Sequence, residues 1–262
     1  MSSNKKISSQ LYFEVSGQCS QPVLVLLHPL GANLRFWDEC LPYWQQKYGV
    51  VAYDRSGSGS SSLPKRIHSI HAHVRELEGL RDNLKLKHII PVGVAVGAMV
   101  AAVYTARYPE RVSSLVLCNP ALSIGGDGQR EFEHRIALIR QGGINAILPR
   151  AVDRAFSGLP KNDRYWRYLE LFRQNNPRSY ELSLLSAKID LSPLLPSIHC
   201  PTLIAVGALD NIFPPEEATR VSNYLPNATY RVIHGAAHLP PFQTPKTFAT
   251  IVDRFLSSNL HL

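Results

Sequence analysis

The chain has 262 residues, 45% of them hydrophobic and 18% charged, so it can bury a sizeable core and is unlike a disordered chain or a coiled coil. Lysine and arginine number 28 against 20 acidic residues, a net charge of +8, but the basic residues are dispersed and accompany no nucleic-acid-binding motif. No apolar run approaches the roughly 18 residues of a membrane helix, and the polar segment 1–10 lacks the apolar stretch of a secretory signal. We therefore expect a cytoplasmic protein without a nucleic-acid or membrane partner. The cysteines lack metal-binding or disulfide-framework spacing and are expected to be reduced, structural thiols: Cys19, Cys40, Cys118 and Cys200.

The first half of the chain alternates short apolar runs with longer segments of helical periodicity. Turn-forming residues bound the short runs, which predict strands over 11–15, 23–28, 50–54, 88–94 and 112–118. The longer segments predict helices over 33–47, 69–86 and 98–108. Such alternation is typical of a mostly parallel sheet with helices on both faces.

The pattern changes between residues 124 and 190, where strand-like runs vanish and arginine, glutamine and aromatic residues recur at helical spacing. Alternation then resumes, with strands predicted over 202–206 and 229–233 and helices over 215–224 and 245–257. We therefore predict one α/β domain, built from 1–123 and 191–262 and interrupted by a helical lid over 124–190.

The junction after the strand 88–94 carries the first chemical signal. Gly93 and Gly97 enclose Val94, Ala95 and Val96, and two glycines at this spacing allow a tight strand-to-helix turn that pushes the middle residue out at the carboxyl end of the sheet. In the G-x-S-x-G nucleophile elbow that middle residue is serine, whereas here it is Ala95. An alternative interpretation is that the two glycines serve only helix–sheet packing.

An acid and a histidine follow at the ends of two later strands. Asp210 comes just after the strand 202–206, and His238 follows the strand 229–233 after a Gly-Ala-Ala turn. The chain order of elbow, acid and histidine is that of an α/β-hydrolase triad.

With these residues the chain resembles the α/β-hydrolase superfamily over nearly its whole length. Residues 26–31 (LLHPLG) resemble the family's oxyanion loop, and 54–61 (DRSGSGSS) resemble its D-x-x-G-x-G-x-S turn. Within the superfamily the chain is similar to the 3-oxoadipate enol-lactonase group, through the His-Pro-Leu-Gly loop followed by Trp37 and through 140–143 (RQGG), which are expected to open a lid helix that ends near Phe156.

The resemblance implies an α/β-hydrolase fold, with a mostly parallel eight-stranded sheet flanked by helices and a helical lid. It makes position 95 the nucleophile position, His238 the general base and Asp210 the group that orients the imidazole. The backbone N–H groups of Leu30 and Val96 would form the oxyanion hole. The implied substrate is a small ester, lactone or related carbonyl compound, and no cofactor or metal is implied.

Alanine at position 95 departs from this pattern because it has no hydroxyl to acylate. Loss of a catalytic serine costs on the order of a millionfold in kcat, so the chain is expected to be nearly inert in ester hydrolysis. The interpretation we favour is an engineered Ser→Ala change at Ala95. The alternatives are a natural serine-less protein in which His238 and Asp210 act as an acid–base pair, as a lyase, isomerase or cofactor-free oxygenase, and a ligand-binding sensor.

Two weaker signals concern the lid and a group of histidines. An arginine reaching inward from the lid could bind a substrate carboxylate, but sequence alone does not say which of Arg135, Arg140, Arg150 and Arg154 does so. His68, His71 and His73 lie close together, but no further ligand completes a metal site around them.

Overall fold

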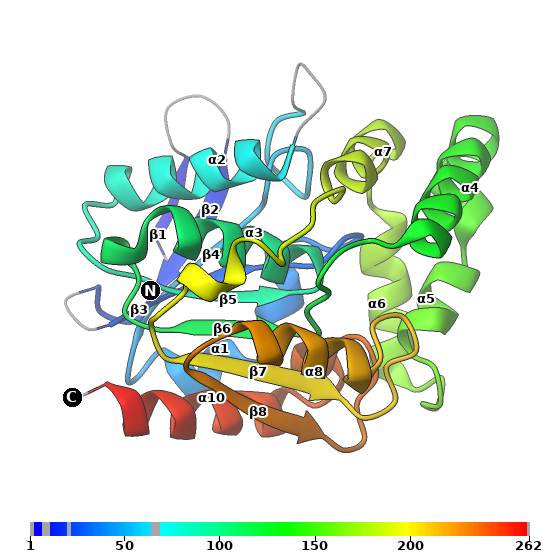
Figure 1. The fold of residues 1–262 in the computed structure, drawn as a ribbon. Helices are drawn as coiled ribbons and strands as arrows, with labels where there is room; N and C mark the ends of the chain where they lie inside the picture. Colours follow the sequence, from blue (N-terminus) through cyan, green and yellow to red (C-terminus); the bar gives the residue numbers. More distant parts are fainter. Residues whose placement is uncertain (1–2, 7–10, 20–21, 64–68, 261–262) are drawn as a thin grey trace.

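The computed structural model describes residues 3–6, 11–19, 22–63 and 69–260, which fold around one eight-stranded sheet with the order β1-β2-β4-β3-β5-β6-β7-β8 (Figure 1). The neighbours from β4 to β8 all pair in parallel, whereas β1 pairs with β2, and β2 with β4, in antiparallel fashion. The predicted, mostly parallel sheet is therefore confirmed. The strands are β1 (Ser3–Lys6), β2 (Tyr12–Ser16), β3 (Val23–Leu27), β4 (Gly49–Tyr53), β5 (Ile90–Val94), β6 (Leu115–Cys118), β7 (Thr202–Gly207) and β8 (Ala228–Ile233).

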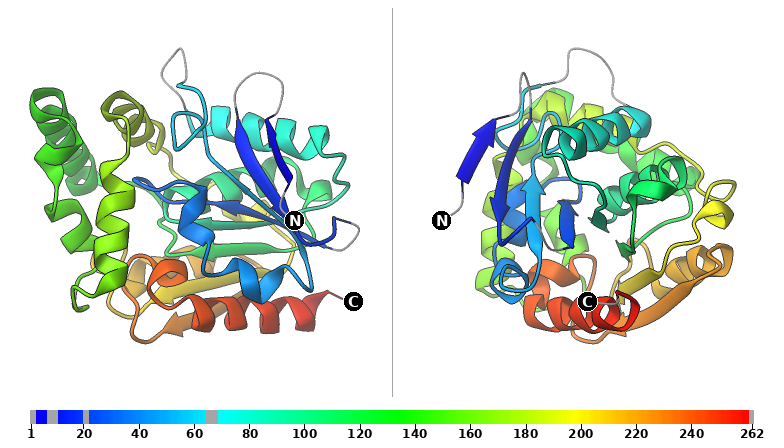
Figure 2. Two further views of the ribbon diagram at one scale, coloured as in Figure 1. Left: turned by 180° about the vertical axis from the view of Figure 1, so that it is seen from behind. Right: turned by 90° about the vertical axis from the view of Figure 1, so that its left-hand side faces the viewer.

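Helices cover both faces of the sheet. In Figure 1, α2, α3 and α8 lie in front of it, and the view from behind in Figure 2 shows α1 and α10 across the other face. Alternate residues of β3 enter separate cores, Leu24 on the side of α1 and α10 and Val25 on the side of α2 and α3. A strand buried on both faces reads as a continuous apolar run rather than an alternating one. The helices outside the lid are α1 (Leu41–Trp44), α2 (Ile70–Asn83), α3 (Val96–Arg107), α8 (Pro215–Tyr224), α9 (Pro240–Gln243) and α10 (Pro245–Asn259), with 3₁₀ turns η1 (Leu34–Trp37), η2 (Pro109–Arg111) and η4 (Leu195–Ser197).

The predicted helix over 33–47 is wrong, because the structure has two short pieces there, η1 and α1. Pro42 cannot donate the hydrogen bond that a continuous helix would need at this point, and its ring clashes with the preceding turn, so it is tolerated only in the first turn of a new helix. Asn33 caps η1 by accepting a hydrogen bond from the N–H of Arg35. The other predicted elements overlap the observed ones, with ends that differ by no more than three residues. Strand β1 lies in the polar segment 1–10, for which no strand was predicted.

The segment between β6 and β7 forms the helical insertion that the sequence predicts. In Figure 1 it lies at the end of the sheet to which the arrowheads of β7 and β8 point. An antiparallel bridge joins Ser123 to Asp190 at its base. The lid predicted over 124–190 thus begins one residue after Ser123 and ends at Asp190 itself. The insertion contains α4 (Gly126–Gly142), η3 (Ile144–Ile147), α5 (Arg150–Ala155), α6 (Asp163–Arg173) and α7 (Pro177–Ser186). The expected helix that opens at 140–143 is wrong, because α4 ends at Gly142, Gly143 takes a φ of +67°, and two separate short pieces, η3 and α5, follow.

One lid helix packs directly on the loop that follows β3. Gly31 has a φ of +73°, and a Cβ there would lie 2.2 Å from the ring of Phe172 in α6. Glycine at position 31 therefore lets the lid reach the loop that carries Leu30.

Among the described residues, no helix combines the length and apolarity that crossing a bilayer requires.

Candidate active site

The turn between β5 and α3 holds Ala95 in a backbone conformation that L-residues rarely adopt. Its φ is +50° and its ψ is −113°, which costs on the order of 1–3 kcal/mol unless the surroundings impose it. The N–H of Ala95 donates to the carbonyl oxygen of Cys118 at 3.0 Å, and its own carbonyl accepts from the N–H of Met99 at 3.1 Å. Strand β6 and helix α3 thus fix the bend from both sides.

The two glycines that flank this turn are required by close backbone contacts. A Cβ on Gly97 would lie 2.2 Å from the carbonyl oxygen of Leu27, and one on Gly93 would lie 2.3 Å from the carbonyl oxygen of Gly97. Neither position leaves room for a side chain. Helix–sheet packing and the elbow are therefore not alternatives here, because the packing of α3 against β3 and β5 is what forms the elbow.

Asp210 and His238 meet beyond the ends of β7 and β8. Nδ1 of His238 lies 2.8 Å from Oδ2 of Asp210, and the other carboxylate oxygen accepts from the N–H groups of Ile212 and Phe213 at 2.8 and 3.1 Å. Burial raises the pKa of Asp210, but His238 and these hydrogen bonds outweigh burial and bring the pKa below its usual value. The ionised carboxylate thus holds one ring nitrogen of His238 and leaves Nε2 without a hydrogen-bond partner among the described residues.

Asn119 is a further residue of this pair that the sequence reasoning missed. It is buried at the end of β6 with a φ of +46°. Its Nδ2 donates to Oδ2 of Asp210 and to the carbonyl of Ala237, and its Oδ1 accepts from the N–H of Gly207. The available signal was its position, a polar residue just after a buried strand at the same sheet edge as Asp210.

Gln243 in α9 is the second residue that the sequence reasoning missed. Its Oε1 accepts from the N–H groups of Ala237 and Leu239, the two neighbours of His238, at 2.8 and 3.2 Å. Its Nε2 donates at 2.8 Å to the carbonyl of Ala155 in α5, which also accepts from the N–H of His238 at 3.2 Å. The histidine loop is therefore held by one glutamine and by the lid.

A cavity of about 480 Å³ lies between the sheet edge and the lid, and the structure brings the predicted residues together around it. Ala95, Val96, Leu30 and His238 line it, with Asp210 behind His238. Val96 begins α3, where the first N–H groups have no partner within the helix. Within the described chain, the N–H groups of Leu30 and Val96 donate no hydrogen bond. Aromatic and aliphatic side chains form much of the remaining wall: Ile124, Phe132, Tyr168, Phe172, Ile212 and Phe213.

The two motif segments around β3 and β4 shape the loop that carries Leu30. Oδ1 and Oδ2 of Asp54 accept from the N–H groups of Leu34 and Ser60, each at 2.7 Å. His28 is buried, with Nδ1 at 2.8 Å from the carbonyl of Pro29 and Nε2 accepting from the N–H of Arg55. Burial lowers the pKa of His28, and the charge of Arg55 lowers it further. His28 is therefore a neutral structural residue.

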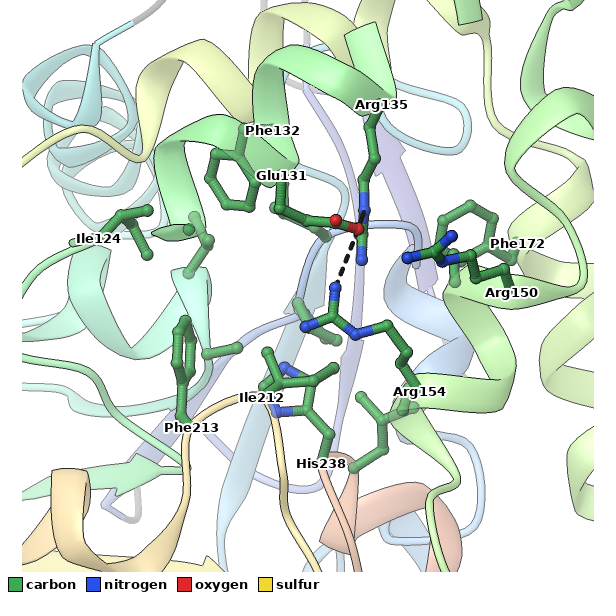
Figure 3. Close-up of a pocket in the computed structure, with 18 of the residues that line it drawn as sticks. Ile124, Glu131, Phe132, Arg135, Arg150, Arg154, Phe172, Ile212, Phe213 and His238 are labelled. Carbon is green, nitrogen blue, oxygen red and sulfur yellow. Dashed lines mark hydrogen bonds and ion pairs between the residues drawn. The ribbon is translucent and has the colours of Figure 1, made fainter. Parts of the chain in front are cut away.

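Three of the four candidate arginines in the lid face the cavity. Arg135, Arg150 and Arg154 line it, and Figure 3 shows their guanidinium groups converging beside Glu131, near His238. Arg140 instead pairs with Glu181 outside the cavity. The described residues contain no group of three or more His, Cys, Asp or Glu arranged to hold a metal ion, and His68 lies outside the described residues.

Comparison with known proteins gives a consistent result. The alpha/beta hydrolase fold family model matches residues 22–245. The chain is 26% identical to 3-oxoadipate enol-lactonase 2 of Acinetobacter baylyi, over 93% of this chain and 91% of the relative. It is 27% identical to RutD of Pseudomonas syringae pv. syringae, named as a candidate carbamate hydrolase, over 94% and 98% of the two chains. Among solved structures, the enol-lactonase of Burkholderia xenovorans LB400 superposes with a TM-score of 0.91 at 23% identity, covering 97% of this chain and all of the other.

Proposed function

The chain belongs to the alpha/beta hydrolase fold family, and from this membership we propose that its cavity is the active site of a hydrolase for small carboxylic esters or lactones, with alanine at the nucleophile position. The observation that carries the proposal is the strained backbone at Ala95, beside a histidine already paired with a buried carboxylate. A positive φ gives an alanine side chain no advantage that would offset its strain. For a nucleophilic residue it does, because this turn presents the side chain to the substrate.

With serine at position 95, each residue has a defined role in the proposed reaction. The serine oxygen attacks the substrate carbonyl while Nε2 of His238 takes its proton, and Asp210 stabilises the imidazolium. The N–H groups of Leu30 and Val96 stabilise the oxyanion. His238 then protonates the oxygen of the leaving group. The bond between this oxygen and the carbonyl carbon breaks, and the acyl group remains bound to the serine. Water then loses a proton to His238 and attacks this acyl group. The carbon–oxygen bond to the serine breaks, and His238 returns the proton to the serine oxygen as the carboxylic acid leaves.

With alanine at position 95 there is no hydroxyl oxygen to accept the acyl group. Loss of this hydroxyl costs on the order of a millionfold in kcat. We therefore propose that the chain with Ala95 is an inactive form of a serine hydrolase, in which an engineered Ser→Ala change has left the cavity intact. Such a chain binds its substrate without turning it over by this route.

The test restores the hydroxyl. We expect Ala95→Ser to hydrolyse p-nitrophenyl acetate, an aryl carbamate or a member of a panel of small lactones at least about a thousandfold faster than the unaltered chain, and to be labelled by a fluorophosphonate. The matched control is Ala95→Ser combined with His238→Ala, which has the hydroxyl but no base. A folded Ala95→Ser variant that neither turns over any of these compounds nor becomes labelled contradicts the proposal.

The complete His238–Asp210 pair favours a second candidate, in which the chain acts as it stands. Here His238 works as an acid–base on a bound water or a C–H bond, in a lyase, isomerase or cofactor-free oxygenase. This candidate predicts turnover by the unaltered chain that His238→Ala abolishes. A ligand sensor, by contrast, binds its ligand tightly and releases it unchanged.

A further inference from the structure

The loop that carries Leu30 packs against a buried arginine. Arg55 follows Asp54 in the turn after β4 and is only 1% exposed. Its Nη2 donates to the carbonyl of Pro29 at 3.3 Å, whereas its Nε and Nη1 have no hydrogen-bond partner among the described residues. Burial lowers the pKa of Arg55, but a guanidinium stays protonated in proteins. A positive charge is therefore held directly against this loop.

The stability of the fold does not explain this buried charge. Taking a charge out of water is unfavourable unless hydrogen bonds and a close opposite charge compensate it, and no described carboxylate accepts a hydrogen bond from the Arg55 guanidinium. Glu76 attracts the charge from a distance, but its carboxylate binds Ser56 and His73. An apolar side chain of similar size would fill the same space without this cost. Residues that break a packing rule in this way are expected at functional sites.

The carbonyl that Arg55 binds belongs to the same peptide group as the N–H of Leu30, which the proposed function assigns to the oxyanion. His28 donates to this carbonyl too. Its Nε2 accepts from the N–H of Arg55 at 3.2 Å, so the proton of the neutral ring is on Nδ1, which lies 2.8 Å from the carbonyl oxygen of Pro29. The Pro29–Leu30 bond is trans, and in a trans peptide the carbonyl and the N–H point in opposite directions. The N–H of Leu30 therefore points away from Arg55 and His28.

From this arrangement we propose that Arg55 is a positioning residue for the oxyanion hole. Pro29 and Leu30 line the cavity, whereas Arg55 and His28 lie behind them and do not. The guanidinium, acting with His28, fixes the Pro29–Leu30 peptide from behind. It also draws electron density toward the carbonyl oxygen, which makes the N–H of Leu30 a stronger donor, because linked hydrogen bonds polarise one another. That the oxyanion forms at this N–H rests on the proposed function.

The first test observes the Leu30 amide in the unaltered chain by NMR. The chain contains two Pro–Leu pairs, 29–30 and 193–194. Isotope labelling of the proline carbonyl carbon and the leucine nitrogen therefore gives two signals in a spectrum that selects bonded carbon–nitrogen pairs. Leu194 donates to the carbonyl of Leu191 and serves as the internal reference. A hydrogen bond to a peptide carbonyl polarises the peptide and moves the nitrogen signal of the next residue to higher frequency.

Variants of Arg55 should change this signal selectively. We expect Arg55→Met and Arg55→Gln, which remove the charge, to move the nitrogen signal of Leu30 to lower frequency and to leave that of Leu194 in place. Arg55→Lys, which keeps the charge, should move the Leu30 signal less. The matched control is Arg81→Met, a second buried arginine that donates to a backbone carbonyl, that of Leu86 ahead of β5. This variant should move neither signal.

The second test measures catalysis of p-nitrophenyl acetate hydrolysis in the Ala95→Ser chain. Loss of an oxyanion donor costs about a hundred- to a thousandfold in kcat, whereas here the donor remains and loses only its support. We therefore expect Arg55→Met to lower kcat about ten- to a hundredfold. KM should change by no more than about threefold, because the N–H of Leu30 acts in the transition state. Arg81→Met should change neither kcat nor KM.

The two tests separate this proposal from the proposed hydrolysis. A Leu30 signal that stays in place in folded Arg55→Met or Arg55→Gln would overturn the hold of Arg55 on the peptide. In an active Ala95→Ser chain, a kcat unchanged by Arg55→Met, or a rise in KM alone, would overturn its role in the reaction. An inert Ala95→Ser chain contradicts the hydrolysis instead, and the Leu30 signal then still decides whether Arg55 polarises this peptide.

Discussion

Replacing Gln243 by leucine should destabilise the loop that carries His238. The leucine side chain is similar in size but cannot accept the hydrogen bonds from the N–H groups of Ala237 and Leu239, or donate to Ala155. Gln243 is 8% exposed, so little water reaches the two N–H groups that lose their acceptor. Each buried donor left unsatisfied costs about 1–3 kcal/mol. We therefore expect Gln243→Leu to lower the free energy of unfolding by about 3 kcal/mol.

Urea unfolding followed by circular dichroism measures this loss directly. The slope of the transition should stay unchanged, because the change alters stability and not the surface exposed on unfolding. The matched control is Gln46→Leu, an exposed glutamine, for which a change within about 0.5 kcal/mol is expected. If Gln243→Leu also stays within about 0.5 kcal/mol of the unaltered chain, the glutamine does not support the histidine loop and the reasoning from its three hydrogen bonds is refuted.

Two further predictions concern the elbow and the lid. Gly97→Ala places its Cβ 2.2 Å from a carbonyl oxygen of β3 and should lower the free energy of unfolding by about 3 kcal/mol. The control is Gly79→Ala in α2, where a Cβ meets nothing within 4 Å and where the change should raise the free energy of unfolding by about 0.5–1 kcal/mol. Equal effects of the two variants in urea unfolding would contradict the close contact at Gly97. Glu39 binds Arg164 and Arg167 of α6. Burial raises its pKa, but these two partners outweigh burial and lower the pKa overall. The stability from a lowered pKa is complete above the unfolded pKa of about 4.3 and is lost as pH falls through the folded value. Glu39→Gln should therefore be less stable by at most about 1 kcal/mol at pH 7, and in thermal unfolding this difference should shrink as pH falls below about 4.3. A difference that does not shrink as pH falls would show that the ion pairs are not its source.

The main features of the fold could be predicted because the central strands, β3 to β7, are buried on both faces and the turns carry glycine. The continuous apolar runs locate β3 and β5, and the spacing of Gly93 and Gly97 predicts the close crossing of α3. The helix over 33–47 was wrong because its apolar spacing was helical while Pro42 prevents a continuous backbone. Periodicity reports which residues are buried, and it does not report where the hydrogen-bond ladder breaks.

The site could be predicted in part for a similar reason. Asp210 and His238 follow strands in a recognisable order, whereas the roles of Asn119 and Gln243 depend on contacts between segments distant in sequence. An amide side chain in a loop has no local pattern that distinguishes a buried partner from a solvated surface group. Which lid arginines face the cavity likewise depends on how α4 and α5 are rotated, and this follows from their packing in the folded lid.

The bridge between Ser123 and Asp190 places the two ends of the insertion side by side at the surface of the core. An insertion whose two ends lie side by side leaves the strands before and after it undisturbed. The entropy lost on closing such a loop rises only slowly with the length of the insertion. Helices of different number and sequence can therefore be exchanged at this one place as a single cassette. New preferences for substrates can then arise in evolution without any change to the parts of the core that perform the chemistry.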